Sequence, residues 1–205
     1  MILCAVGIAG IAASALWRHR TPWVELTTGT FLTPGRAVPD FSLIDQQGRG
    51  FSSANLRGHW SLLFFGYTNC PDLCPTTLTT LAAMQRRLRA AKAPALPQVI
   101  FVSVDAKRDT PAQLAKYVPY FDPEFIGLTA PDQPSIEAVA KKLGVSVIIQ
   151  PAPDGTYTVD HSGAIFVVDP AGRLTAILSG PFNVDALQGD FQRIVAARGG
   201  LTGPA

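Results

Sequence analysis

The sequence predicts an α/β fold, and three observations indicate it. Short apolar runs typical of buried strands recur along the chain, and several of the segments between them carry hydrophobic residues at helical spacing. Strand and helix patterns therefore alternate, which is the order typical of α/β domains. The composition agrees, because 47% hydrophobic and 16% charged residues are typical of a globular protein. We expect one domain in the 205 residues, behind an apolar N-terminal segment.

The first seventeen residues form an uncharged and strongly apolar segment. Residues 1–17 lie at the short end of the length that crosses a bilayer, and Ala13-Ser14-Ala15 resembles a signal-peptidase site. We favour a membrane anchor, with a cleaved export signal and a buried helix as the alternatives. Arg18 and Arg20 follow the segment, which is opposite to the positive-inside expectation for an exported domain. Cys4 lies within the segment and is expected to be an unpaired thiol.

Residues 18–37 are expected to form a tether, because prolines and glycines interrupt any periodicity there. The domain is then expected to span residues 38–199, with residues 200–205 as a tail. A chain beginning near Val38 should therefore fold on its own. The first element of the domain is a predicted β-hairpin over residues 41–51, with a glycine-containing turn.

The rest of the domain supplies the alternating elements. Strands are predicted at residues 60–66, 98–105, 145–149, 164–169 and 174–178. Helices are expected after residue 74, after Thr110, before Gly144 and after Asn183. Thr110 begins a capping-box pattern, Gly144 stands where a left-handed residue ends a helix, and Asn183 is a favourable helix cap. This order is expected of a thioredoxin-like α/β domain with an N-terminal β-hairpin extension.

Two cysteines four residues apart, Cys70 and Cys74, follow the predicted strand at residues 60–66. Pro75 has no N–H group and is tolerated only in the first turn of a helix, so the helix should begin at Cys74 or Pro75. Cys70 then lies on the preceding loop as the more exposed sulfur. A helix N-terminus lowers the pKa of a thiol, which makes the thiolate a better nucleophile and metal ligand. We expect a metal site or a redox pair, with a structural disulfide as the alternative.

His161 is expected to complete the site. It precedes the strand at residues 164–169, and a loop on the cysteine side of the sheet brings its imidazole to the sulfur pair. Two thiolates and one imidazole suit copper in either oxidation state, or zinc if a fourth ligand is present. A solvated or hydrogen-bonded histidine is the alternative interpretation.

Charge and spacing argue against two other classes of protein. The formal charge of +2, from 17 basic and 15 acidic residues without a long run of one sign, gives no basic surface for nucleic acid. A thiol peroxidase would need proline at position 63 and threonine at position 67. Leu63 and Tyr67 stand there instead.

Several motifs together resemble the Sco/SenC family of cytochrome c oxidase assembly proteins. In chain order they are Gly66-Tyr67-Thr68-Asn69-Cys70-Pro71-Asp72-Leu73-Cys74-Pro75, Val102-Ser103-Val104-Asp105, Arg108-Asp109-Thr110-Pro111, Phe121-Asp122, Phe125-Ile126-Gly127-Leu128-Thr129 and Val159-Asp160-His161-Ser162. The resemblance covers about residues 37–198, and the combination of the cysteine block with the Asp-His-Ser block is its most specific part.

The resemblance implies a thioredoxin-like copper chaperone, with Cys70, Cys74 and His161 as ligands of Cu(I) or Cu(II). It implies that the protein delivers copper to the dinuclear copper centre of cytochrome c oxidase, or prepares that centre. The expected partners are the copper-bearing subunit of the oxidase, other copper chaperones and thiol reductants, and the membrane through the N-terminal segment. The expected location is the inner membrane, with the domain facing the periplasm or the equivalent intermembrane space. An exported soluble form is the alternative.

A thiol-disulfide oxidoreductase is the alternative function. In that case Cys70 and Cys74 form a catalytic redox pair that reduces the cysteines of the apo-oxidase subunit. This reaction does not require His161, so the histidine discriminates between the two functions.

Overall fold

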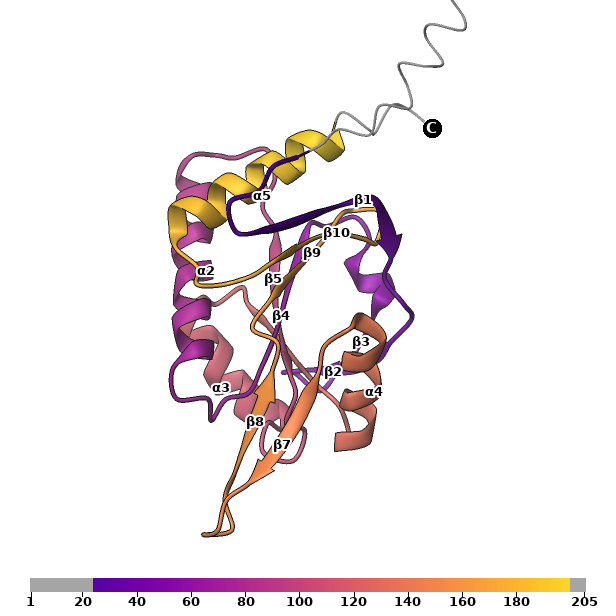
Figure 1. Cartoon of the computed structure of the whole chain (residues 1–205), viewed down its shortest axis with the longest axis vertical. Coiled ribbons are helices and arrows are strands. Elements are labelled where there is room, and N and C mark those ends of the chain that lie inside the picture. Colours follow the sequence, from indigo (N-terminus) through magenta and orange to yellow (C-terminus); the bar gives the residue numbers. More distant parts are fainter. Residues whose placement is uncertain (1–23, 200–205) are drawn as a thin grey trace, which may run out of the picture.

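A mixed eight-stranded sheet forms the centre of the computed structural model, which describes residues 24–199 (Figure 1). Across the sheet, the strands are β1 (Gly29–Ala37), β10 (Arg173–Leu178), β9 (Ile165–Val168), β4 (Ser61–Gly66), β5 (Gln98–Ser103), β6 (Ile126–Thr129), β2 (Ser42–Asp45) and β3 (Gly50–Ser52). Strands β4, β5 and β6 are parallel, and the other pairs are antiparallel. The predicted hairpin of residues 41–51 is confirmed as β2 and β3, which extend the sheet beyond β6.

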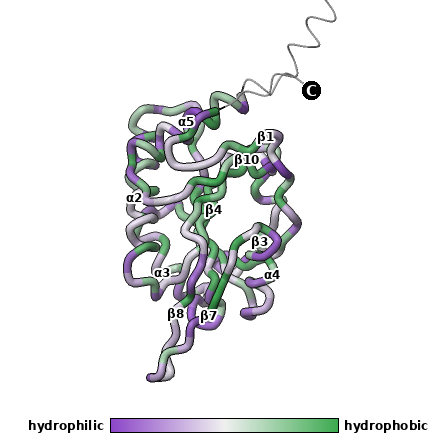
Figure 2. Tube along the Cα trace, in the orientation of Figure 1, coloured by the Kyte–Doolittle hydropathy of each residue, from purple (hydrophilic) through white to green (hydrophobic). Residues whose placement is uncertain are grey.

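The central strands are buried on both faces. In β4, Leu62 and Phe64 point to one face while Leu63 and Phe65 point to the other, and all four are at most 1% exposed. Side chains alternate between the faces of a strand, so a continuous apolar run fits a sheet that is covered on both sides. Figure 2 shows the resulting hydrophobic colour along β4.

Helices cover the two faces unequally. Helices α2 (Leu73–Ala90), α3 (Pro111–Phe121) and α5 (Val184–Gly199) pack on one face, whereas α4 (Gln133–Leu143) and the 3-10 turn η1 (Ser53–Leu56) pack on the other (Figure 1). The predicted helix ends are confirmed. Thr110 Oγ1 accepts a hydrogen bond from the N–H of Gln113 at 3.2 Å, and Asn183 Oδ1 accepts one from the N–H of Ala186 at 2.9 Å. Gly144 ends α4 with a φ of 82°.

The prediction of a tether over residues 18–37 is wrong for residues 29–37, because they form the edge strand β1. Its backbone pairs with β10 on both sides of an irregularity between Phe31 and Arg36. Asp190, which is completely buried on α5, accepts hydrogen bonds from the backbone N–H groups of Thr27 and Thr28. Backbone pairing with a distant strand therefore orders a stretch whose local sequence lacks any strand periodicity.

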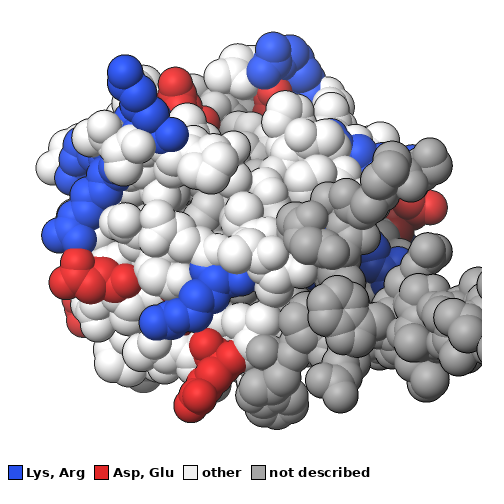
Figure 3. Space-filling view, turned by 90° about the horizontal axis from the view of Figure 1, so that it is seen from above, with Lys and Arg blue, Asp and Glu red and all other residues white. Residues whose placement is uncertain are grey.

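The apolar segment 1–17, Cys4 and the tail at 200–205 lie outside the described residues. Within residues 24–199, no helix combines the length and the hydrophobicity that crossing a membrane requires. On the face seen in Figure 3, basic and acidic side chains are scattered among uncharged residues.

Removing β1 is expected to destabilise the domain. A chain beginning at Val38 loses the β1–β10 hydrogen bonds and the half-buried side chains of Phe31 and Leu32, whereas a chain beginning at Val24 keeps them. We expect a loss of about 2–4 kcal/mol in the free energy of unfolding, since full burial of one such side chain contributes about 1.5–3 kcal/mol. Urea unfolding of the two chains measures this difference. Equal midpoints would show that β1 contributes no stability.

A separate two-stranded sheet carries the histidine. Strands β7 (Val147–Pro151) and β8 (Tyr157–His161) pair only with each other among residues 24–199 and form a hairpin that projects from the body of the domain (Figure 1). The prediction of a loop at His161 is therefore wrong, because this residue is the last of β8. The β8 pattern is short and places one buried residue, Val159, among exposed ones, so its periodicity is weak.

Candidate metal centre

The two cysteines lie at the carboxyl end of β4, where the chain turns into α2. Helix α2 begins at Leu73, one residue before the earlier of the two predicted starts, so Cys74 is its second residue and Cys70 lies on the preceding loop. Cys74 is completely buried and Cys70 is partly exposed, which confirms that Cys70 is the more accessible sulfur. Both are free thiols in the structure. The backbone N–H of Cys74 donates to Cys70 Sγ at 3.5 Å.

The structure brings His161 to the buried sulfur. His161 Nε2 lies 3.7 Å from Cys74 Sγ. Among residues 24–199, however, no three His, Cys, Asp or Glu side chains already form a group that could hold a metal ion. The site is thus a close sulfur–imidazole pair, with a second sulfur four residues earlier on the loop before α2.

Strand geometry and aromatic packing orient the imidazole. Alternate residues of β8 point to the same side, so His161 shares a face with the buried Val159, while Asp160 points to solvent. The rings of Tyr67 and Phe64 contact the imidazole edge-to-face, with centroids 5.9 Å and 6.4 Å away. These contacts hold the ring at the end of the sheet.

The state of the imidazole suits metal binding. His161 Nδ1 lies 3.0 Å from the carbonyl oxygen of Ser162. A proton on Nδ1 donates to this carbonyl and leaves the lone pair of Nε2 directed toward Cys74, a tautomer that follows from the hydrogen bond. Burial lowers the pKa of His161, which favours the neutral form that ligates metals.

The prediction of a lowered thiol pKa at the start of α2 is wrong for Cys74. Burial raises the pKa of this thiol, although the backbone N–H of Tyr67 opposes the shift. The free-energy cost of removing a thiolate from water exceeds the stabilisation that the N-terminus of the helix gives to its charge. Burial therefore favours the neutral thiol of Cys74, and binding of a metal ion there releases its proton.

Gly66, the last residue of β4, makes room for the buried sulfur. A Cβ atom at this position would lie 2.6 Å from Phe101 Cε2 and 2.8 Å from Cys74 Sγ. Both distances are shorter than van der Waals contact. The absence of a side chain at Gly66 thus lets Cys74 pack directly against the sheet.

Gly66→Ala is expected to lower the free energy of unfolding by about 1–3 kcal/mol, because overpacking forces the sulfur or the Phe101 ring to move. Gly50→Ala is the matched control in another strand, where an added Cβ meets nothing within 4 Å. Its effect should stay within about 0.5 kcal/mol. Urea unfolding measures both variants, and equal effects would show that the space at Gly66 is not needed.

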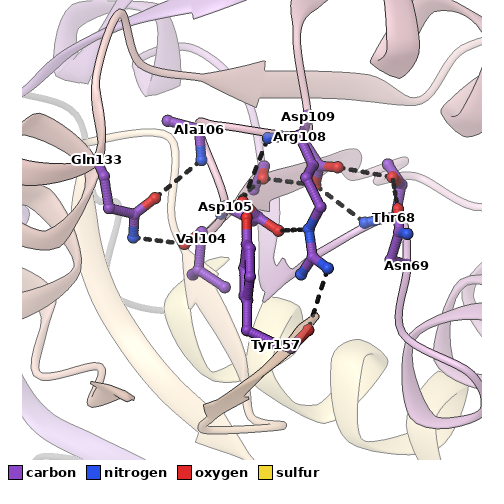
Figure 4. Close-up of polar contacts among 10 residues, drawn as sticks. Thr68, Asn69, Val104, Asp105, Ala106, Arg108, Asp109, Gln133 and Tyr157 are labelled. Atoms are coloured by element: carbon purple, nitrogen blue, oxygen red, sulfur yellow. Dashed lines mark hydrogen bonds and ion pairs between the residues drawn. The ribbon is translucent and has the colours of Figure 1, made fainter. Parts of the chain in front are cut away.

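Asp109 fixes the loop that carries Cys70. Its buried carboxylate accepts hydrogen bonds from the backbone N–H of Thr68 at 2.9 Å, from Thr68 Oγ1 at 2.6 Å and from Ser103 Oγ at 2.6 Å (Figure 4). Burial raises the pKa of Asp109, while these hydrogen bonds oppose the shift. The contact joins the loop after β4 to the loop after β5, because the carboxyl ends of parallel strands meet at one edge of the sheet. Sequence periodicity gives no signal for this pairing.

The fold and the site define a thioredoxin-like protein with a cysteine pair and a histidine at one edge of its sheet. The SCO1/SenC family model matches residues 32–196. The chain therefore belongs to the SCO1/SenC family.

Similar proteins support the assignment of this chain to the SCO1/SenC family. A Stutzerimonas stutzeri protein named for copper binding is 39% identical over 153 residues, covering 75% of this chain and 74% of that protein. The mitochondrial SCO2 homologue of Bos taurus is 40% identical over 161 residues, which are 77% of this chain and 59% of the bovine protein. The chain thus spans less than two thirds of the bovine relative.

Solved structures share the fold. Arabidopsis thaliana ScoI with copper bound is 32% identical, with a TM-score of 0.73 over 78% of this chain and 98% of that one. BsSco, described as a Sco-family cytochrome c oxidase assembly protein with a disulfide switch, is 28% identical. Its TM-score is 0.61 over 78% of this chain and 94% of that one.

Proposed function

We propose that this protein is a copper chaperone that binds copper through Cys70, Cys74 and His161 and delivers it to the dinuclear copper centre of cytochrome c oxidase. The observation that carries the proposal is the approach of His161 Nε2 to Cys74 Sγ, at 3.7 Å. Two thiolates favour Cu(I) and an imidazole accommodates Cu(II), so this donor set accepts either state. The copper-bound ScoI of Arabidopsis and the S. stutzeri relative support the choice of metal.

Copper is the cargo in this proposal, and release proceeds by ligand exchange. The partly exposed Cys70 is the accessible ligand, whereas Cys74 and His161 are held in the domain. A thiolate of the copper-bearing oxidase subunit replaces the ligands of the chaperone, and the Cys74 thiol regains its proton as copper leaves. Other copper chaperones load the site and thiol reductants keep the cysteines reduced.

The proposed location is the outer side of an inner membrane, facing the periplasm or the equivalent intermembrane space. The mitochondrial bovine relative and the apolar segment at residues 1–17 support it. Residues 1–17 act as the membrane anchor.

A thiol-disulfide oxidoreductase is the second candidate function. The pairing of an accessible Cys70 with a buried Cys74 four residues later favours it, as does the disulfide switch described for BsSco. In this exchange Cys70 and Cys74 form an S–S bond and give up two electrons and two protons, and the disulfide of the oxidase subunit accepts them and breaks into two thiols. The same oxidation removes both thiolates from the copper site, so copper loading and thiol redox state are coupled.

Metal analysis of the reduced protein tests the chaperone proposal. We expect about one copper per chain for the wild type, with His161→Ala weakening Cu(II) more than Cu(I), because two thiolates alone hold Cu(I). Asp160→Asn is the matched control, since Asp160 is exposed on the opposite side of β8. A wild-type protein without copper, or a His161→Ala variant with both states bound as in the wild type, would overturn the proposed ligand set.

A further inference from the structure

Side-chain contacts help to set the position of His161. Within residues 24–199, the β7–β8 hairpin shares no backbone ladder with the eight-stranded sheet that carries the cysteines. Hydrogen bonds within the hairpin fix its own register, with Val147 opposite His161, and do not fix its distance from Cys74. The short link from His161 to β9, which begins at Ile165, limits that distance, and side-chain contacts set it further.

Such contacts lie at the start of β8. Tyr157 Oη donates a hydrogen bond to Asp105 Oδ1 at 2.8 Å, and Arg108 Nη1 donates to the carbonyl oxygen of Tyr157 at 3.1 Å (Figure 4). The Arg108 guanidinium also stacks over the Tyr157 ring, 3.8 Å from its centroid. One arginine thus holds both the backbone and the side chain of the residue four positions before His161.

Arg108 is itself paired with a buried carboxylate. Its Nε pairs with Asp105 Oδ2, and Asp105 is only 2% exposed. The guanidinium lies 5.6 Å from the centroid of the Tyr67 ring, and Tyr67 is the ring that meets the imidazole of His161 edge-on. Arg108 therefore contacts two neighbours of His161. One is Tyr157, which lies on the same strand, and the other is Tyr67, which packs against the imidazole.

The same loop also holds the cysteines. We call residues 105–109 the bridging loop. Asp109 accepts hydrogen bonds from Thr68, two residues before Cys70. Asp105 and Arg108 form hydrogen bonds with Tyr157. The bridging loop thus contacts both Thr68, on the loop that leads to the cysteines, and Tyr157, on the hairpin that carries His161 (Figure 4).

We propose that Arg108, Asp105 and Tyr157 are positioning residues that set His161 against the cysteine pair and thereby control the Cu(II) state of the site. The inference rests on the proposed copper-binding function. Loosening this contact lets the hairpin carry the imidazole away from Cys74. Cu(II) then loses its nitrogen ligand, while Cu(I) remains on the two thiolates.

Two conservative variants test the proposal. Arg108→Lys keeps the charge but loses the planar fork that contacts Asp105 and Tyr157 together. Tyr157→Phe keeps the ring under the guanidinium and removes only the hydroxyl that contacts Asp105. Thr158→Ala is the control, because Thr158 is exposed on the opposite side of the same strand.

The readouts are Cu(I) and Cu(II) affinities and the visible and electron paramagnetic resonance spectra of the Cu(II) protein. For Arg108→Lys we expect Cu(II) affinity to fall about 10-fold or more, the usual range for lost outer contacts, with Cu(I) affinity nearly unchanged. Its Cu(II) spectra should approach those of His161→Ala. Tyr157→Phe should change in the same direction by less, and Thr158→Ala should match the wild type.

A second measurement separates this inference from the proposed function. In the metal-free protein, the NMR signals of the His161 ring, assigned with His161→Ala, should move toward those of a solvated imidazole in Arg108→Lys. If the wild type binds no copper, the proposed function fails and the ring signals still decide the positioning role. Unchanged ring signals and spectra, or equal weakening of both copper states with a matching loss of stability, would overturn the positioning role.

Discussion

Cys70→Ser and Cys74→Ser are each expected to abolish copper binding by the reduced protein. Either replacement leaves one thiolate and one imidazole, too few soft donors to compete with cellular thiols for Cu(I). We expect the affinity to fall by at least about 100-fold, because loss of outer contacts alone costs about 10–100-fold. The copper-to-protein ratio after gel filtration with excess glutathione measures the effect.

Two controls accompany these variants. Cys4→Ser removes the third cysteine of the chain, far from the other two in sequence, and should bind copper like the wild type. Cys70 is partly exposed, so Cys70→Ser should keep the fold even if a hydroxyl at the completely buried Cys74 lowers stability. Retention of copper by a folded Cys70→Ser protein would remove this residue from the site.

Cells that carry His161→Ala are expected to lose cytochrome c oxidase activity when copper is scarce. The variant lacks one ligand, so it holds too little copper for delivery, and added copper should restore activity partly by mass action. The Cys70–Cys74 couple should remain reversible, because the imidazole contributes no electron to disulfide exchange. Oxidase activity at limiting and at added copper measures the outcome.

The same experiment separates delivery from reduction. Cys70→Ser should abolish oxidase activity under either function, so it serves as the reference for complete loss. Full oxidase activity in His161→Ala at limiting copper, with none in Cys70→Ser, would reject delivery and favour the oxidoreductase.

The local sequence pattern is enough to predict secondary structure wherever neighbouring residues determine the backbone conformation. The apolar run of β4 predicts a strand buried on both faces, and Thr110, Gly144 and Asn183 mark helix ends through their own hydrogen bonds or backbone angles. The cysteine pair is likewise evident, because its spacing and Pro75 place it at the start of a helix.

Contacts between residues distant in sequence determine the features that the local pattern does not predict. Residues 29–37 form β1 because β10 supplies hydrogen-bond partners more than one hundred residues later in the chain. The pKa of Cys74 is raised because the sheet and α2 bury its sulfur, which outweighs the helix terminus. Neither effect is encoded in neighbouring residues.

Residue chemistry and motif spacing predict the α/β fold and the three candidate ligands Cys70, Cys74 and His161, because both are local properties of the chain. How those residues meet depends on contacts between distant segments. His161 ends a strand of a separate hairpin, and the side chains of the bridging loop tie that hairpin to the cysteine loop. These contacts join segments distant in sequence through buried charges and hydrogen bonds. Their geometry exists only once the sheet has brought the loops to one edge.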